Sequence, residues 1–282
     1  MIKSFSLCAD DFAITPGVSR SILELVRQGR LTATSVMTNT PHLGSFAKEL
    51  SGFKDKIDIG LHLNLTLGEP LGAMPVLAPS GAFLPLRQLS MKMLRSELER
   101  GEIRSEVHRQ LDAFEIAFGM QPDFIDGHQH VHALPGLRDV LFAIMVSRYP
   151  STTPSFRHPG DSPLSILRRG IALRKALGLT VLTIGLAASA KRWGIATNHG
   201  FSGFSDFLSS RDYGADFGRY LLSPGARHLV MCHPGEIDDE LVTLDPVVAT
   251  RPLEAAFLAS DRFIETCAAA GMSLARFGGR AG

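Results

Sequence analysis

The amino-acid sequence predicts an α/β protein in which a parallel sheet is connected by helical crossovers. Short apolar runs typical of buried strands alternate with longer segments whose apolar residues recur at helical spacing. Acidic and imidazole side chains stand at or near the ends of four of the apolar runs. Functional residues of β/α folds gather at the carboxyl ends of parallel strands, so this placement supports the same fold class.

The first strand and helix are the best defined. Residues 4–9 read as a strand, and the next segment carries Thr15 as a plausible N-cap, Pro16 in the first turn and Gly29 as a stop. The apolar residues of this segment fall on one helical face: Val18, Ile22, Leu25 and Val26.

The alternation continues along the chain. Further strands are expected over residues 32–39, 57–65, 123–128, 155–159, 227–234 and 272–277. Further helices are expected over residues 44–53, 87–100, 103–118, 135–148 and 252–270.

Composition narrows the functional class. The chain is 45% hydrophobic and 20% charged, as in ordinary globular proteins, and its net charge of +1 offers no broad field for nucleic acid. Cys8, Cys232 and Cys267 show no paired spacing, which argues against a disulfide framework and against a cysteine zinc site. The first apolar run meets two aspartates before reaching signal-peptide length, so we expect a cytoplasmic protein.

Residues 176–190 form a run of fifteen without a charge. A spanning helix needs ~20 apolar residues, so no transmembrane segment is expected. We expect a buried strand or helix of the core here. The alternative is an apolar lid or a membrane-touching patch near a lipid-linked substrate.

The polar residues at the strand ends are acids and histidines: Asp10, Asp11, His62, Asp126, His128 and His233. Two imidazoles and one carboxylate can bind a divalent ion and leave positions open for water and substrate. Neighbouring aspartates at a strand end should point differently, so one could bind the ion while the other handles protons. A metal-assisted hydrolase needs this pairing.

Four motifs occur together in the chain: CADDF (8–12), GLHLNLTLGEPL (60–71), IDGHQHVH (125–132) and MCHP (231–234). In order and spacing they resemble the YdjC-like carbohydrate deacetylases, which include chitooligosaccharide deacetylases and hopanoid-associated members. The likeness covers most of residues 3–160 and resumes near residues 198–238.

This resemblance implies a single domain over residues 1–282, folded as a modified (β/α) barrel of the glycoside hydrolase/deacetylase type. Residues 161–197 would be a divergent apolar insertion. The implied activity is hydrolysis of a linear amide C–N bond, removing acetate from an N-acetylated sugar or oligosaccharide, with lipid-linked sugars among the candidates. The implied cofactor is one divalent ion, magnesium or zinc first and manganese or cobalt next. Homodimers are common in the family.

The resemblance also assigns roles to individual residues. It implies three metal ligands, Asp11, His62 and His128, with Asp10 as general base and His233 as general acid. Apart from the resemblance, three residues at or after expected strand ends are candidates for substrate binding: His130, His132 and Arg157. One of the two histidines could instead orient a metal ligand. Ala13 replaces a family glycine, so a positive φ there would strain the backbone.

Two other functions fit parts of the pattern. Two histidines and a carboxylate also form the facial triad of iron(II) oxygenases, although the β/α alternation argues against that fold. A sugar-binding protein without catalysis is the other alternative, and the complete set of chemical residues argues against it.

Overall fold

The computed structural model describes residues 3–277 of the chain. Within them, one eight-stranded sheet has the order β5-β4-β3-β2-β1-β7-β6, with β8 pairing with β1, and every ladder in it is parallel. The strands are β1 Lys3–Phe12, β2 Ala33–Val36, β3 Asp58–Leu63, β4 Phe124–Gly127, β5 Ser155–Phe156, β6 Phe201–Ser202, β7 His228–Cys232 and β8 Met272–Leu274. The parallel sheet expected from the sequence is confirmed.

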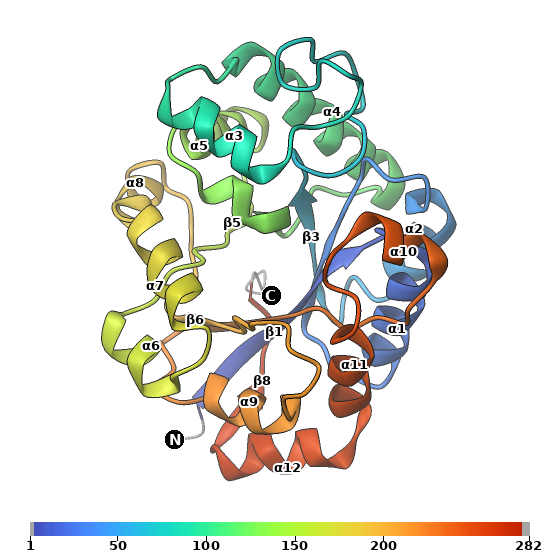
Figure 1. The fold of residues 1–282 in the computed structure, drawn as a ribbon, viewed down its shortest axis with the longest axis vertical. Coiled ribbons are helices and arrows are strands. Elements are labelled where there is room, and N and C mark those ends of the chain that lie inside the picture. The colour runs from blue at the N-terminus through green and yellow to red at the C-terminus, as the bar shows by residue number, and fades with distance from the viewer. Residues whose placement is uncertain (1–2, 278–282) are drawn as a thin grey trace.

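The sheet curls until its two ends approach each other. The backbone N–H of Phe156 in β5 donates to the carbonyl of Ala196 at 2.8 Å, and Phe156 also forms a parallel bridge with Thr197. Residue 197 leads directly into β6, at the other end of the strand order. The fold is therefore a modified (β/α) barrel in a single domain, as expected, and its helices surround the sheet (Figure 1).

Most expected helices are present. The helices of residues 3–277 are α1 Pro16–Arg27, α2 Leu43–Ser51, α3 Leu86–Leu94, α4 Arg100–Phe118, α5 Leu137–Arg148, α6 Pro163–Arg169, α7 Leu173–Leu182, α8 Leu186–Arg192, α9 Tyr213–Tyr220, α10 Asp239–Leu244, α11 Arg251–Ala259 and α12 Asp261–Ala269. The sequence did not predict α6, α9 and α10. Thr15 caps α1 as predicted, its hydroxyl accepting from the N–H of Val18, and Gly29 follows the helix with φ 68°.

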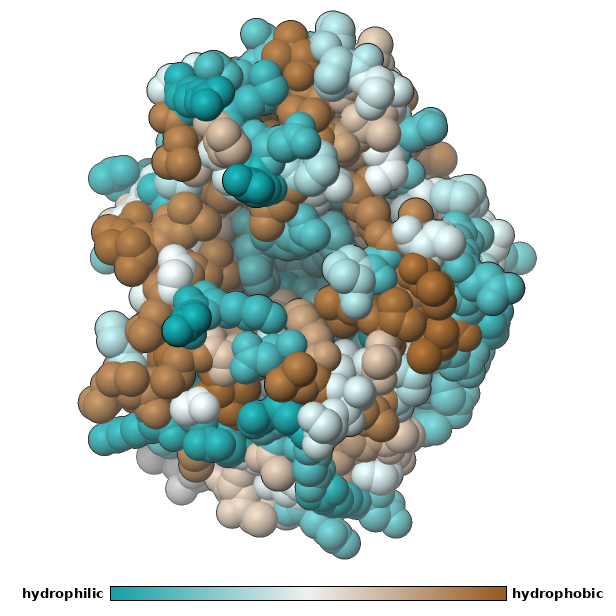
Figure 2. All heavy atoms as spheres, in the orientation of Figure 1, coloured by the Kyte–Doolittle hydropathy of each residue, from teal (hydrophilic) through white to brown (hydrophobic). Residues whose placement is uncertain are grey.

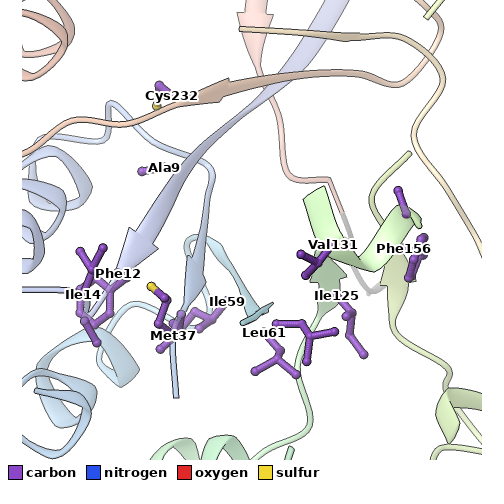
Figure 3. Packing of buried hydrophobic residues seen from close by; sticks show 14 of the residues in the cluster. Ala9, Phe12, Ile14, Met37, Ile59, Leu61, Ile125, Val131, Phe156 and Cys232 are labelled. Atoms are coloured by element: carbon purple, nitrogen blue, oxygen red, sulfur yellow. The ribbon is translucent and has the colours of Figure 1, made fainter. Parts of the chain in front are cut away.

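The core lies between the sheet and its helices. Figure 3 shows Leu61 of β3 beside Ile125 of β4 and Ile59 of β3 beside Met37, with Phe12 packed near the end of β1. All five side chains are buried. Strands covered on both faces explain why β1, β3 and β7 read as nearly continuous apolar runs.

The long helix expected over residues 252–270 is wrong, because the structure has two helices there. Ser260 has extended backbone, with φ −80° and ψ 163°, and separates α11 from α12. Its hydroxyl donates to the carbonyl of Phe257 at 2.6 Å, a local bond that competes with helical pairing. Ser260 followed by Asp261 is also a typical helix start.

The expectation of a buried core element at residues 176–190 is also wrong. This segment forms α7 and α8, which contact the barrel on one side only and leave Val181 66% and Ile184 70% exposed. By length and composition, the helical stretch Leu173–Arg192 could cross a membrane. It breaks at the turn before Gly185, however, and the ten residues of α7 span ~15 Å of a ~30 Å hydrocarbon core.

Candidate metal centre and cavity

Asp10 and Asp11 reach the same cavity because β1 is irregular where they stand. Its register with β2 shifts between Ala9 and Phe12, and Asp11 takes a left-handed conformation with φ 68°. In a regular strand neighbouring side chains point to opposite faces. The irregularity turns both carboxylates towards the carboxyl end of the barrel, where both line the cavity.

Ala13 has the strained backbone that the missing glycine implied, with φ 71°. Its N–H donates to the hydroxyl of Ser19 at 3.1 Å, and its carbonyl accepts from the hydroxyl of Thr40 at 2.6 Å. These two bonds hold the loop in place despite the alanine, so the strain does not displace the aspartates before it.

Asp11, His62 and His128 form a compact buried cluster. Asp11 Oδ1 lies 3.2 Å from His62 Nε2 and 3.0 Å from His128 Nδ1, and one ligand atom from each residue lies within 4.8 Å of the others. Burial alone would raise the pKa of Asp11. The Arg251 guanidinium, 2.6 Å from Asp11 Oδ2, and His128 outweigh burial and hold that pKa well below its ordinary value.

The surroundings of His62 fit a metal ligand. Its Nδ1 lies 2.7 Å from Asp126 Oδ1 and 2.9 Å from the Ser35 hydroxyl, which leaves Nε2 to face Asp11. A carboxylate behind a ligating histidine fixes its tautomer and orientation. Burial would lower the pKa of His62, but Asp126 and Asp11 raise it to about 10, so an ion would displace a proton from Nε2.

Asp10 is held by a different arginine. Arg157 binds it with both terminal nitrogens, at 2.6 and 2.7 Å, and also lies 2.5 Å from Asp126 Oδ2 and 3.0 Å from Cys8 Sγ. Burial would raise the pKa of Asp10, but Arg157, with smaller contributions from His62 and His233, outweighs burial and lowers it. Cys8, Asp10 and Asp126 could in principle hold an ion, yet the Arg157 guanidinium already stands among them.

The three histidines after β4 point in three directions. Residues His128–Ala133 form a short 3-10 turn (η1) in which Gln129 and His130 have φ 51° and 59°. His128 meets Asp11, whereas His130 lines the cavity beside Phe204. Burial, then Arg157, lowers the pKa of His130 to about 3, so its ring is neutral.

Two of the three predicted substrate-binding residues lie away from the cavity surface. His132 is 0% exposed, donates from Nε2 to the carbonyl of Arg157 at 3.1 Å, and packs on Phe156. Arg157 is also 0% exposed, with its guanidinium bound to carboxylates. The geometry therefore makes both residues supports of the site, and of the three only His130 is placed to touch a substrate.

The cavity has a volume of about 690 Å³. We call Asp10, Asp11, His62 and His128 the floor, because they lie at the strand ends where Figure 2 shows a hydrophilic hollow. We call the surrounding side chains the rim: Lys175, Leu179, Phe204, Phe207, Pro246 and Val247. Lys175 in α7 donates to the carbonyl of Ser205 at 2.7 Å, which ties α7 to the loop after β6.

His233 also lines the cavity, just after β7. Its backbone N–H donates to the Glu254 carboxylate at 2.7 Å, and its ring stands edge-on to Phe207 with the ring centres 5.6 Å apart. Burial raises the pKa of Glu254. The structure thus brings the two predicted catalytic residues, Asp10 and His233, to one cavity with the predicted ligands.

Sequence reasoning missed four supporting residues: Ser35, Asp245, Arg251 and Glu254. Arg251 is buried and bridges Asp11 to Asp245 Oδ2, which lies 2.7 Å from its Nη2. A basic and an acidic residue at the start of an expected helix were the only signal for Arg251 and Glu254. Ser35 lies inside an expected strand, and a serine there does not by itself indicate a functional role.

Comparison with known proteins decides the family. The family model described as YdjC-like protein matches residues 5–269. The chain belongs to the YdjC-like family. It is 30% identical over 247 residues to proteins named chitooligosaccharide deacetylase from Yersinia pestis (strain Pestoides F) and Yersinia pseudotuberculosis (strain YPIII), covering 86% of each chain.

One solved structure has the same fold across the whole chain. It is a candidate cellobiose-phosphate cleavage protein from Enterococcus faecalis V583, with a TM-score of 0.72, 22% sequence identity and 98% coverage of both chains. The resemblance read from the four motifs is thereby confirmed at the level of family and fold.

Proposed function

We propose that this YdjC-like protein is a metal-dependent deacetylase that removes an N-acetyl group from an amino sugar or an oligosaccharide containing one. The observation that carries the proposal is the division of the floor into two parts. Asp11, His62 and His128 form a cluster that could hold an ion, while Asp10 stands beside them with its own arginine. Family relatives named chitooligosaccharide deacetylase support the same reaction class.

Asp11, His62 and His128 would hold the ion. When bound, a divalent ion would lower the pKa of the attacking water and polarise the acetyl carbonyl. Two imidazoles favour zinc or another borderline cation over magnesium, which prefers oxygen ligands. Asp126 orients His62 for this role, and Arg251 holds the second oxygen of Asp11.

Asp10 would accept the proton of the attacking water. Its low pKa keeps it ionised across the physiological range, so it is available as a base at neutral pH. The bidentate contact with Arg157 fixes the carboxylate and prevents it from turning towards the ligand cluster. A weak base suffices when the water has already been acidified.

His233 would act as the general acid that completes the reaction. The water oxygen forms a bond to the carbonyl carbon, and the C–N bond then breaks as the His233 imidazolium gives its proton to the departing nitrogen. The products are acetate and a free amino sugar. The edge-on contact with Phe207 and the backbone bond to Glu254 hold His233 at the cavity wall.

The cavity supports a sugar-sized substrate, because a volume of about 690 Å³ is within the usual range for small-molecule sites. The rim is largely apolar, through Leu179, Phe204, Phe207 and Val247. We therefore include lipid-linked sugars among the substrates to be tested. Homodimerisation is a separate proposal, checked by analytical ultracentrifugation.

The decisive experiment measures acetate release from a panel of soluble and lipid-linked N-acetylated sugars. Metal-stripped protein would receive zinc, cobalt, manganese or magnesium separately. His128→Ala tests the ligand cluster, and His108→Ala is the matched control, because His108 lies on α4 and contacts Arg148 at the surface. We expect metal-dependent acetate release that is lost in His128→Ala and kept in His108→Ala.

Failure of that assay would be informative. Oxygen uptake with iron(II) and a 2-oxo acid would favour the oxygenase alternative. Stoichiometric metal and sugar binding without acetate release from any substrate would favour a binding protein. Either result would overturn the proposed reaction while leaving the ligand cluster in place.

A further inference from the structure

The insertion that carries α6, α7 and α8 differs in charge from the rest of the chain. Between Asp161 and Asp206 the sequence has six of the 29 basic residues and none of the 28 acidic ones. The net charge of +1 therefore conceals a basic segment on an otherwise acidic protein.

Most of these basic side chains are available to a partner. Five are exposed: Arg168, Arg174, Lys175, Lys191 and Arg192. The sixth, Arg169, is buried and pairs with Asp161 at 2.7 Å. Among residues 3–277 the five exposed cations form no ion pair. Arg168 donates to the Ser223 hydroxyl, and Lys175 donates to the Ser205 carbonyl and stands 4.7 Å from the centre of the Phe207 ring.

Large apolar side chains stand exposed among these cations. Leu164 and Leu167 of α6 are 59% and 58% exposed, Val181 and Ile184 at the end of α7 are 66% and 70% exposed, and Trp193 after α8 is 42% exposed. Figure 2 shows hydrophobic residues gathered along the edge of the molecule that α6 and α7 form, beside the mouth of the cavity. We call the exposed residues of α6–α8 and Trp193, apart from Lys175, which lines the cavity, the basic–apolar face.

Helix α7 has two sides with different roles. Leu173, Leu177, Val181 and Ile184 recur at helical spacing along its outer side. Lys175 and Leu179 lie on its other side and line the cavity. The helix is therefore a wall between the cavity and whatever covers the outer side.

We propose that the basic–apolar face docks on the surface of an anionic phospholipid bilayer, with its apolar side chains in the headgroup region and its cations against the lipid phosphates. Exposed apolar residues flanked by lysine and arginine, without acids, are the features of interfacial membrane segments. A protein partner of mixed charge would require acidic residues on this face, and the sequence between Asp161 and Asp206 has none. Docking would bring the mouth of the cavity to the lipid surface. The inference goes beyond the proposed deacetylation and does not depend on it.

The single tryptophan of the chain, Trp193, reports directly on this face. The full-length protein would be mixed with vesicles of phosphatidylcholine alone or of phosphatidylcholine with phosphatidylglycerol. We expect at least fivefold more protein to co-sediment with the anionic vesicles, a blue shift of Trp193 emission, and release by high salt.

Two double variants separate the apolar contribution to vesicle binding from the electrostatic one. Val181→Ser with Ile184→Ser removes apolar side chains, and Lys191→Glu with Arg192→Glu reverses charge, each at exposed positions where folding should be unaffected. Both should lower binding to anionic vesicles at least fivefold. Matched controls on other elements make the same chemical changes and should bind like wild type: Ile116→Ser with Ile264→Ser, and Lys54→Glu with Lys56→Glu.

Three results would overturn the inference: no preference of the wild type for anionic vesicles, equal loss of binding in the controls, or a dimer that Val181→Ser disperses. In the last case the face would serve self-association. Vesicle binding is measured without sugar, and the Lys191 and Arg192 changes should leave turnover of a soluble substrate intact. Failure here is thus distinguishable from failure of the deacetylase proposal.

Discussion

The floor and the rim of the cavity are built in opposite ways. Every floor residue is at most 7% exposed, lies at or next to the end of a strand and is bonded to a second charged or imidazole group. The rim consists mostly of apolar side chains on α7 and on loops that follow β6 and α10. In the proposed function, the reacting groups would belong to the rigid strand ends of the barrel, and helix α7 and the loops, which can vary more in sequence, would select the substrate.

Within the floor, Asp10 and Asp11 are bound differently by two buried arginines. Arg157 occupies both oxygens of Asp10, whereas Arg251 occupies only one oxygen of Asp11 and leaves the other facing two imidazoles. Neighbours in sequence are thus bound by two different arginines, 147 and 240 positions away, and we propose different chemical roles for them on this ground.

The largest expected effect is on the two aspartates. Asp10→Asn should lower kcat about 10³-fold and keep a full equivalent of metal, because it removes the base and leaves the ligands. Asp11→Asn should lose activity together with metal. Acetate release and metal content by mass spectrometry check both variants, and loss of metal from Asp10→Asn would reverse the assignment.

A large stability effect is expected from the buried arginine behind the floor. Arg157→Met should destabilise the fold by about 3–5 kcal/mol, because Asp10 would lose its arginine partner in the buried floor and Asp126 would keep only His62. Thermal and urea unfolding measure the change. Arg262→Met is the control, since Arg262 pairs with Asp212 at the surface, and equal losses would contradict the account.

Rim changes should have smaller and different effects. Val247→Ala and Leu179→Ala should raise KM ~10-fold and leave kcat within a factor of about three, because they remove apolar contact with the substrate but neither a reacting group nor a contact that holds one. Steady-state kinetics on one soluble substrate separates the two constants. Leu222→Ala, an exposed leucine outside the cavity, serves as control. A fall in kcat without a change in KM would remove the distinction between rim and floor.

The smallest effect concerns the strained loop beside Asp11. Ala13→Gly should stabilise the protein by about 0.5–1 kcal/mol, since relief of the left-handed alanine exceeds the entropy cost of glycine. Differential scanning calorimetry would detect the shift. A lower melting temperature would mean that the hydrogen bonds to Ser19 and Thr40 have already removed the strain.

The sequence predicted the floor far better than the rim. Strands such as residues 57–65 and the caps Thr15 and Gly29 follow from local pattern, and the polar residues at strand ends meet because parallel strands end together. The exposure of Val181 depends on how α7 packs on the barrel, which periodicity does not reveal. The pairing of Arg251 with Asp11 could not be predicted from local sequence pattern either, because it joins distant segments of the chain.

Anomalous X-ray diffraction from crystals grown with zinc or cobalt would test whether Asp11, His62 and His128 hold the ion while Asp10 remains free of it. The account predicts one strong peak within bonding distance of Asp11, His62 and His128, with Arg157 still bound to Asp10. A peak among Cys8, Asp10 and Asp126, with Arg157 displaced, would contradict the division of labour between the two aspartates.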